Sequence, residues 1–387
     1  MIAMASLLDD HELLGRLVAF NTVSSKPSDP LLDWVCNYLD RPGVRLERVA
    51  AGEAGKSNLF AVAGPEDAEG GMTLCGHVDV VPADEPGWST DPFTLYEEGD
   101  RYFARGACDM KGFDCLAINR LAAVDPSTLR RPLAVLLTCD EEVGSLGAKR
   151  FAEDPGLISR IPTNVLIGEP TSLRAVRMHK GHMKVRVILR GRSAHTGSPH
   201  LGINAVEAAE PVLAAIRTMR EQLAHEPSEN AVCFPRVPYS VLAVARIQGG
   251  QAVNVIPDLC ELDVGLRLMP ERLGDEVFEA LKHAIEQAAD SAAEVDVTMV
   301  NENPPMLTSE EAPLHRRLCH LLGQTSSAGV SFASDGGWLN RAGMSCVLFG
   351  PGNIEVAHRP DEYLPKDEFH RGGEVLDQLI SEICIEV

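Results

Sequence analysis

Short apolar segments that suit buried strands alternate with helical patterns along the first part of the chain, and polar residues follow most of these segments. This alternation is typical of an open α/β sheet, in which ligands bind at the carboxyl ends of the strands. Strands are expected over residues 44–49, 58–63, 133–138 and 164–167 and within 74–82, and helices over residues 6–20 and 30–39, from 113 onward and up to 151.

The pattern changes after about residue 173 to the order strand, helix, strand, strand, helix, strand. A ferredoxin-like unit that is complete in itself has this order. We therefore expect an inserted domain over residues 174–300 and a discontinuous first domain over residues 1–173 and 301–387. The inserted strands are expected over residues 184–189, 240–248, 260–269 and 294–300, the inserted helices over 203–219 and 271–289, and the later elements over 313–322, 345–349 and 368–385.

The bulk composition restricts the partners of the protein. A chain of 387 residues favours two domains, and its formal net charge of -21 argues against nucleic acid and anionic membranes. Residues 1–14 lack a signal-peptide pattern, and the apolar runs are too short to cross a bilayer. The 10 cysteines form no C-x-x-C pair, which favours reduced thiols in a cytoplasmic protein. The acidic balance mildly favours a small cationic substrate.

Seven acidic or histidine residues follow the predicted strands of the first domain. The first two lie two residues apart and therefore share one face of a strand, and a carboxylate beside a histidine commonly holds the ring of a metal ligand. Histidine nitrogen and carboxylate oxygen are typical zinc ligands, and five of them with a shared bridge suggest two metals about 3.5–4 Å apart. The seven residues are His77, Asp79, Asp109, Glu141, Glu142, Glu169 and His358.

Each of these residues also has a simpler interpretation. Adjacent Glu141 and Glu142 are common at a helix start, and Asp109 before a helix is commonly a cap. Glu169 before a proline fits an ordinary turn, and His358 fits a surface position. The placement of the whole set at the strand exits of one sheet favours the metal site over these separate interpretations.

Four motifs carry a resemblance to a known family: residues 76–82 (GHVDVVP), 106–112 (GACDMKG), 140–144 (DEEVG) and 168–171 (GEPT). With them the chain resembles, over essentially its whole length, the dinuclear-zinc amidohydrolases that include aminoacylases, carboxypeptidases and desuccinylases. The resemblance implies a zinc-peptidase-like, three-layer αβα catalytic domain with an inserted ferredoxin-like α+β domain for dimerisation and as a lid. Cys108 departs from the small residues that are more usual before the aspartate.

The resemblance also implies a ligand set. His77 and Glu169 would bind one zinc ion, Glu142 and His358 would bind the other, and Asp109 would bridge them. Two cations at this site would polarise the substrate carbonyl and acidify a water molecule. A site made of histidines and carboxylates also accepts cobalt or manganese.

Two further roles follow from the same resemblance. Asp79 would orient His77, and Glu141 would be the general base that takes a proton from the water and later delivers it to the leaving amine. The peptide bond between Asp109 and Met110 is a candidate for the cis conformation, as in the family.

The inserted domain carries three more candidates by resemblance. His195, in the loop over residues 191–199, would reach the active site of a partner subunit and stabilise the tetrahedral oxyanion, which implies a homodimer formed through this domain. Asn254 and Arg267 would bind the substrate carboxylate, for which a guanidinium is well suited. A polar loop and a surface arginine are the simpler alternatives.

Three stretches favour the family members that hydrolyse N²-acetyl-L-ornithine to L-ornithine and acetate in arginine biosynthesis: residues 169–173, 179–182 and 351–363. The nearest alternatives are a succinyl-diaminopimelate desuccinylase and a general deacylase of small N-acyl amino acids. A dinuclear aminopeptidase or dipeptidase is an alternative of another class. A binding protein without activity is disfavoured because the full ligand set and Glu141 are present.

Overall fold

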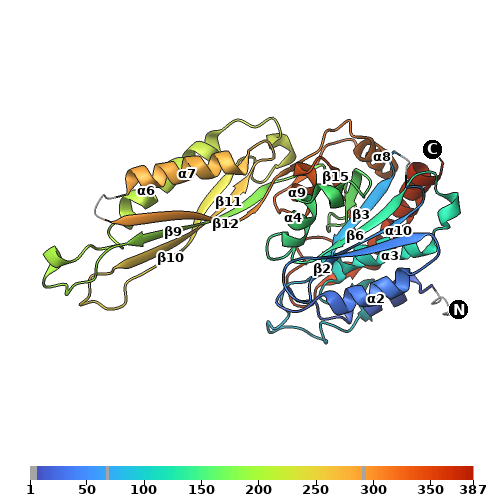
Figure 1. Cartoon of the computed structure of the whole chain (residues 1–387), viewed down its shortest axis with the longest axis horizontal. Coiled ribbons are helices and arrows are strands. Elements are labelled where there is room, and N and C mark those ends of the chain that lie inside the picture. Colours follow the sequence, from blue (N-terminus) through green and yellow to red (C-terminus); the bar gives the residue numbers. More distant parts are fainter. Residues whose placement is uncertain (1–6, 67–68, 290–292, 387) are drawn as a thin grey trace. The chain divides into compact units, whose positions relative to one another are not determined.

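The computed structural model describes residues 7–66, 69–289 and 293–386 (Figure 1). The chain divides into two compact units. The first unit spans Met1–Met178, Thr308–Ala328 and Ser334–Val387, and the second spans His179–Leu307 and Gly329–Ala333. The second unit is therefore inserted in the sequence of the first.

A six-stranded sheet with the order β1-β2-β6-β3-β7-β15 forms the centre of the first unit. β6, β3, β7 and β15 run parallel to one another, whereas β1 and β2 are antiparallel to their neighbours. The carboxyl ends of the four parallel strands therefore lie at one edge of the sheet. The strands are β1 (Val44–Ala50), β2 (Ser57–Ala63), β3 (Met72–His77), β6 (Leu133–Thr138), β7 (Asn164–Ile167) and β15 (Ser345–Leu348).

Helices cover both faces of this sheet (Figure 1). One face packs into a large apolar core to which five helices contribute: α1 (Asp10–Val18), α2 (Asp29–Leu39), α3 (Gly112–Ala123), α8 (Pro313–Leu322) and α10 (Lys366–Ile380). The other face packs against α4 (Leu146–Ala152) and α9 (Gly336–Arg341). There the ring of Phe60 on β2 meets the ring of Phe151 on α4 at 5.7 Å. This arrangement confirms the predicted αβα layers.

The first helix is shorter than the sequence pattern predicts. It begins at Asp10 because Asp9 forms a capping box with Glu12: the Asp9 carboxylate accepts the Glu12 N–H at 2.7 Å, and the Glu12 carboxylate accepts the Asp9 N–H at 3.2 Å. Residue 6 of the predicted range lies outside the described residues.

Several short elements were missed, because two or three residues are too few to show a period. One small sheet has the order β16-β5-β4 and another the order β13-β8-β14. Their strands are β4 (Tyr96–Glu98), β5 (Arg101–Phe103), β8 (Met178–His179), β13 (Met306–Leu307), β14 (Gly329–Val330) and β16 (Tyr363–Pro365), and a short helix α5 spans Pro155–Ile158.

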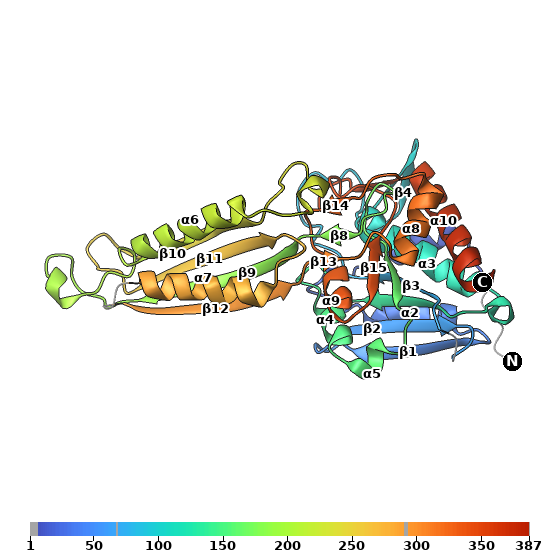
Figure 2. The same ribbon diagram turned by 90° about the horizontal axis from the view of Figure 1, so that it is seen from above.

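The second unit has the predicted β-α-β-β-α-β order: β9 (Gly181–Arg190), α6 (Ala209–His225), β10 (Val241–Gly249), β11 (Leu259–Leu268), α7 (Gly274–Ala288) and β12 (Glu294–Asn303). Its antiparallel sheet has the order β10-β11-β9-β12, which confirms the ferredoxin-like topology. α6 and α7 lie side by side on one face (Figure 2). Alternate residues of β9, including Val185, Val187 and Leu189, are buried under them.

The predicted start of α6 was wrong by six residues (203 against Ala209). Residues 203–208 form a loop because Ile203 pairs with Arg192 and the Asn204 side chain accepts the N–H groups of Val206 and Glu207. Such an Asx turn competes with helix formation. Among the described helices, none is long and apolar enough to cross a membrane.

Candidate active site

The sheet edge of the first unit gathers five of the predicted ligands. His77 ends β3, and Glu142 and Glu169 follow β6 and β7. His358 lies in the loop after β15, and Asp109 lies in the turn Ala107–Lys111 that leads into α3. Residues from distant parts of the sequence therefore meet at the carboxyl ends of the parallel strands, where ligands are expected to bind in such a sheet.

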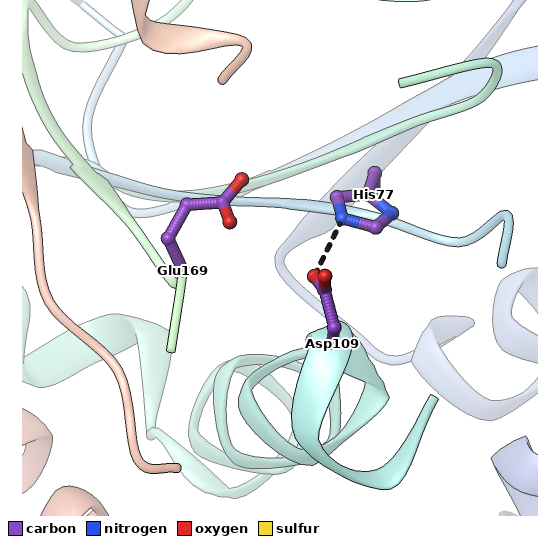
Figure 3. Close-up of side chains that lie close together, drawn as sticks. All are labelled: His77, Asp109 and Glu169. Atoms are coloured by element: carbon purple, nitrogen blue, oxygen red, sulfur yellow. Dashed lines mark hydrogen bonds and ion pairs between the residues drawn. The ribbon is translucent and has the colours of Figure 1, made fainter. Parts of the chain in front are cut away.

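Asp109 lies between the two histidines. Its Oδ1 atom is 3.2 Å from Nε2 of His77, and its Oδ2 atom is 3.1 Å from Nε2 of His358. The same nitrogen of His358 is 3.0 Å from Oε1 of Glu142. Figure 3 shows that His77, Asp109 and Glu169 reach this point from three different segments. One carboxylate thus faces both halves of the cluster.

The donor set fits a pair of metal ions. Two groups of possible ligand atoms, each within 4.8 Å of one another, share Asp109: His77, Asp109 and Glu169 form the first, and Asp109, Glu142 and His358 the second. Imidazole nitrogen with carboxylate oxygen suits zinc and related divalent metals. A carboxylate common to two groups can bridge two metal ions that lie a short distance apart.

The charges at this cluster are strongly coupled. Burial opposes protonation of His77, but its hydrogen bond to Asp109 and the nearby carboxylates outweigh burial and raise the pKa of His77 well above its usual value. The hydrogen bonds to Asp109 and Glu142 raise the pKa of His358 to about 10. Burial alone would raise the pKa of Asp109, but the two histidines hold it well below its usual range. Positive charge is therefore favoured on both sides of Asp109.

Glu141 lies beside the cluster and is held by two contacts. The Ser145 hydroxyl donates to its Oε1 atom at 3.0 Å, and its main-chain N–H donates to the Asp79 carboxylate at 3.0 Å. Burial raises the pKa of Glu141 and of Glu169 well above the usual carboxyl value. A carboxylate destabilised by burial is a stronger proton acceptor than one in water, which suits a general base.

Asp79 contacts His77 mainly through its main chain. Nδ1 of His77 donates to the carbonyl oxygen of Asp79 at 2.9 Å, whereas the nearest carboxylate oxygen is 3.8 Å away. This hydrogen bond leaves Nε2 facing Asp109. The carboxylate instead accepts the N–H groups of Glu141 and Glu142 at 3.0 and 3.3 Å and the Ser24 hydroxyl at 2.7 Å.

Sequence reasoning missed a buried ion pair next to this segment. The Lys56 ammonium group donates to the Asp140 carboxylate and to the Ser24 carbonyl, both at 2.7 Å. Asp140 has a φ of 59°, a left-handed conformation that turns the chain just before Glu141. Asp140 lies within a recognised motif, but no pattern in the sequence points to Lys56 as its partner.

The candidates of the inserted domain belong to the second unit, whereas the five predicted metal ligands belong to the first. These candidates are His195, Asn254 and Arg267. The loops of the first two pair with each other: His195 bridges to Val255, and the Thr196 N–H donates to the Asn254 carbonyl at 3.1 Å. His195 and Asn254 are exposed. Arg267 lies on β11, opposite His182 on β9.

The segment around the central aspartate matches one expectation from the resemblance and shows how a departure from it is accommodated. The Asp109–Met110 peptide bond is cis, as predicted. Cys108 is buried, and its thiol donates to the Asn353 carbonyl at 3.5 Å, so its side chain packs against the loop that carries His358.

The sequence similarity to known proteins covers nearly the whole chain. The profile of peptidase family M20/M25/M40 matches residues 73–382. An acetylornithine deacetylase of Edwardsiella ictaluri is 34% identical over 386 residues, which cover 96% of this chain and 97% of that protein. An acetylornithine deacetylase of Vibrio parahaemolyticus is 35% identical over 382 residues, covering 96% and 98%.

Solved structures show the same fold. An M20 family metallo-carboxypeptidase from Sulfolobus solfataricus has a TM-score of 0.77 at 17% identity, covering 96% of this chain and 98% of that chain. The aminopeptidase PepT from Bacillus cereus has a TM-score of 0.75 at 19% identity, covering 97% and 99%. With the family profile matching more than half of the sequence, the chain belongs to peptidase family M20/M25/M40 and is a metal-dependent amidohydrolase.

Proposed function

We propose that this enzyme hydrolyses the N-acetyl amide of N²-acetyl-L-ornithine to L-ornithine and acetate. The reaction class is supported by one observation above all: the two oxygens of Asp109 face His77 and His358, and Glu141 lies beside this cluster. The substrate is supported by the acetylornithine deacetylases that are about one-third identical over nearly the full length.

The proposed metal ligands are those of the two groups that share Asp109. His77 and Glu169 would hold one zinc ion, Glu142 and His358 would hold the other, and Asp109 would be shared between them. When bound, the ions polarise the amide carbonyl and acidify a water molecule. Zinc is the proposed metal, and the same ligands accept cobalt or manganese.

Glu141 carries the proton in this proposal. Its carboxylate takes a proton from water as the water oxygen bonds to the acetyl carbon. It then gives this proton to the amine nitrogen as the carbon–nitrogen bond breaks, so one proton is returned for each one taken. Ser145 and the Asp79 carboxylate support this role, since they hold the Glu141 side chain and main chain respectively.

The inserted domain supplies the remaining groups. We assign residues 1–173 and 301–387 to catalysis and residues 174–300 to a lid and dimerisation domain. His195 acts in the partner subunit's active site by donating a hydrogen bond to the oxyanion. The pairing of its loop with that of Asn254 supports a shared binding surface.

Asn254 and Arg267 are the proposed ligands of the substrate carboxylate. Arg267 lies in a polar setting that includes His179 and His182, whose pKa values are lowered to about 4 by burial and, to a smaller extent, by the positive charge of Arg267. A guanidinium suits this role because it can pair with a carboxylate through two parallel hydrogen bonds.

We also propose a cytoplasmic location and a role in arginine biosynthesis. All 10 cysteines are free thiols, most of them buried, which suits a reducing compartment. The proposed product, L-ornithine, is a precursor of arginine.

A comparison of substrates tests the proposal. Purified enzyme loaded with zinc is assayed side by side on N²-acetyl-L-ornithine, N-succinyl-diaminopimelate and a dipeptide with a free amino terminus. We expect kcat/KM to be highest for acetylornithine. A preference for the succinyl substrate would identify a desuccinylase, and a preference for the dipeptide would contradict deacylation.

A further inference from the structure

A buried ion pair joins the loops that carry two of the proposed metal ligands. The side chains of Arg105 and Glu362 are each about 1% exposed, and Nη1 of Arg105 donates to Oε2 of Glu362 at 2.8 Å. Neither residue has a role in the proposed reaction. Burying two charges is unfavourable unless further hydrogen bonds satisfy both groups. The other hydrogen bonds of Arg105 and Glu362 therefore identify the segments that the pair connects.

Glu362 binds the main chain of the central aspartate. Its Oε1 atom accepts the N–H of Cys108 at 2.9 Å and the N–H of Asp109 at 3.1 Å. Glu362 also lies four residues after His358 in the same loop. One carboxylate therefore joins the backbone of Asp109 to the segment that carries His358.

Arg105 extends this connection to two more segments. It donates to the Arg359 carbonyl at 3.3 Å, next to His358, and to the Pro82 carbonyl at 3.0 Å, in the loop that follows His77. It also pairs with Glu85, which is about one-third exposed. The guanidinium thus reaches the loops on both sides of Asp109.

We infer that Arg105 and Glu362 are positioning residues that set the separation of Asp109 and His358, and with it the affinity of the metal site formed by Asp109, Glu142 and His358. The inference rests on the proposed dinuclear function. The two residues touch the ligands' own main chain or neighbouring carbonyls, as groups that orient metal ligands do.

The two proposed metal sites are expected to respond differently to loss of the Arg105–Glu362 pair. His77 and Glu169 are held by the sheet, because they end or follow the central strands β3 and β7. His358 lies in a loop that is tied to Asp109 through Glu362. Loss of the pair therefore weakens the His358 site more than the His77 site.

Metal titration measures this effect without substrate. Apo-protein is titrated calorimetrically with Zn²⁺, and with Co²⁺ whose visible absorption reports ligand geometry. Wild-type protein is expected to bind two ions. Glu362→Ala is expected to bind the first ion normally and the second about 10- to 100-fold more weakly, with an altered Co²⁺ spectrum. Glu362→Gln keeps an oxygen that accepts both N–H groups, so its affinity is expected to fall between the two.

Two matched controls separate this effect from general loss of stability. Glu85→Ala removes the other carboxylate partner of Arg105, and Asp10→Asn weakens the Arg120–Asp10 pair, which joins α1 and α3. Both are expected to bind two ions with wild-type affinity.

The outcomes distinguish the inference from the function on which it rests. Wild-type affinity for the second ion in folded Glu362→Ala or, should that variant not fold, in Glu362→Gln, would overturn the inference. Equal weakening in Glu85→Ala would overturn it as well. Binding of a single ion by wild-type protein would instead contradict the dinuclear function.

Discussion

Glu141 and Glu142 are adjacent in sequence, but the structure gives them different surroundings. Oε1 of Glu142 is 3.0 Å from Nε2 of His358, whereas the Glu141 carboxylate accepts a hydrogen bond from the Ser145 hydroxyl at 3.0 Å. Substitution of Glu142, a proposed metal ligand, and of Glu141, the proposed general base, is therefore expected to have different effects.

Glu141→Gln is expected to lower kcat by about 10²- to 10⁴-fold because the amide cannot accept the proton from water. Metal content, measured by elemental analysis, should stay at the wild-type level. Glu142→Gln is the matched comparison and is expected to lose metal. Loss of metal in Glu141→Gln would show that the two roles are exchanged.

His179 predicts a pH dependence of stability. Burial lowers its pKa from 6.5 to about 4, so between these values the unfolded chain binds a proton that the folded protein does not. The contribution of His179 to the free energy of unfolding is therefore fully present above the pKa of the unfolded state and is lost as the pH falls toward 4. The expected loss is about 2 kcal/mol between about pH 7 and pH 5.

His179→Gln removes the titrating group, and glutamine can still donate to the Lys180 carbonyl that His179 contacts at 3.0 Å. Denaturant unfolding at both pH values should show a smaller loss of stability for the variant than for the wild type. Equal losses in the two proteins would assign the acid sensitivity to other groups.

At the scale of elements, the exit of β7 is set by its close packing against α3. A Cβ atom on Gly168 would lie 1.9 Å from ring atoms of Phe113, so an alanine there requires the strand exit or the helix to move. Gly168→Ala is expected to cost about 1–3 kcal/mol, as overpacking does, and to weaken metal binding because Glu169 is the next residue.

Gly265→Ala is the control for this substitution. Gly265 lies in β11, and a Cβ atom there would meet nothing within 4 Å. Its stability and metal affinity are expected to match the wild type, measured by thermal unfolding and metal titration. A Gly168→Ala protein that equals this control in both measurements would contradict the packing argument.

The elements also show where local sequence patterns stop being informative. Long periodic segments such as β11 and α8 lie within one residue of their predicted positions. α1 and α6 begin later than their apolar spacing indicates, because the side chains of Asp9 and Asn204 bind nearby main-chain N–H groups. Such capping contacts depend on single polar atoms, which an apolar period does not record.

At the scale of the whole molecule, the proposed dimer with His195 acting in the partner subunit's active site predicts complementation. Glu141→Gln and His195→Ala proteins should each be nearly inactive. When they are mixed and allowed to exchange subunits, each mixed dimer gains one site with both groups intact. About a quarter of wild-type activity is expected from an equal mixture, because half of the dimers are mixed and each has one working site.

Size-exclusion chromatography with light scattering should show that both variants remain dimers. Activity of the mixture equal to the mean of the separate variants would contradict a role for His195 in the partner's site. A monomeric wild-type protein would contradict the dimer itself.

Much of this protein was determined by the sequence alone. The family, the αβα layers, the ferredoxin-like topology and the cis bond after Asp109 were predicted and are confirmed. Strand and helix periods can be recognised from short stretches of sequence. Their alternation predicts a parallel sheet, and ligand-binding residues are expected at the carboxyl ends of its strands. The roles of the candidate site residues stay predictions, although the structure brings His77, Asp109, Glu142, Glu169 and His358 together.

Only the tertiary structure decided how these residues are held. The Asp79 carboxylate accepts the main-chain N–H groups of Glu141 and Glu142, contacts that the spacing of Asp79 from His77 did not suggest, and it lies 3.8 Å from the ring of His77. Arg105 and Glu362 are 257 residues apart in sequence, and no period relates them. Such contacts follow from the packing of whole loops, because a hydrogen bond depends on distances of a few ångströms that residue type and order do not specify.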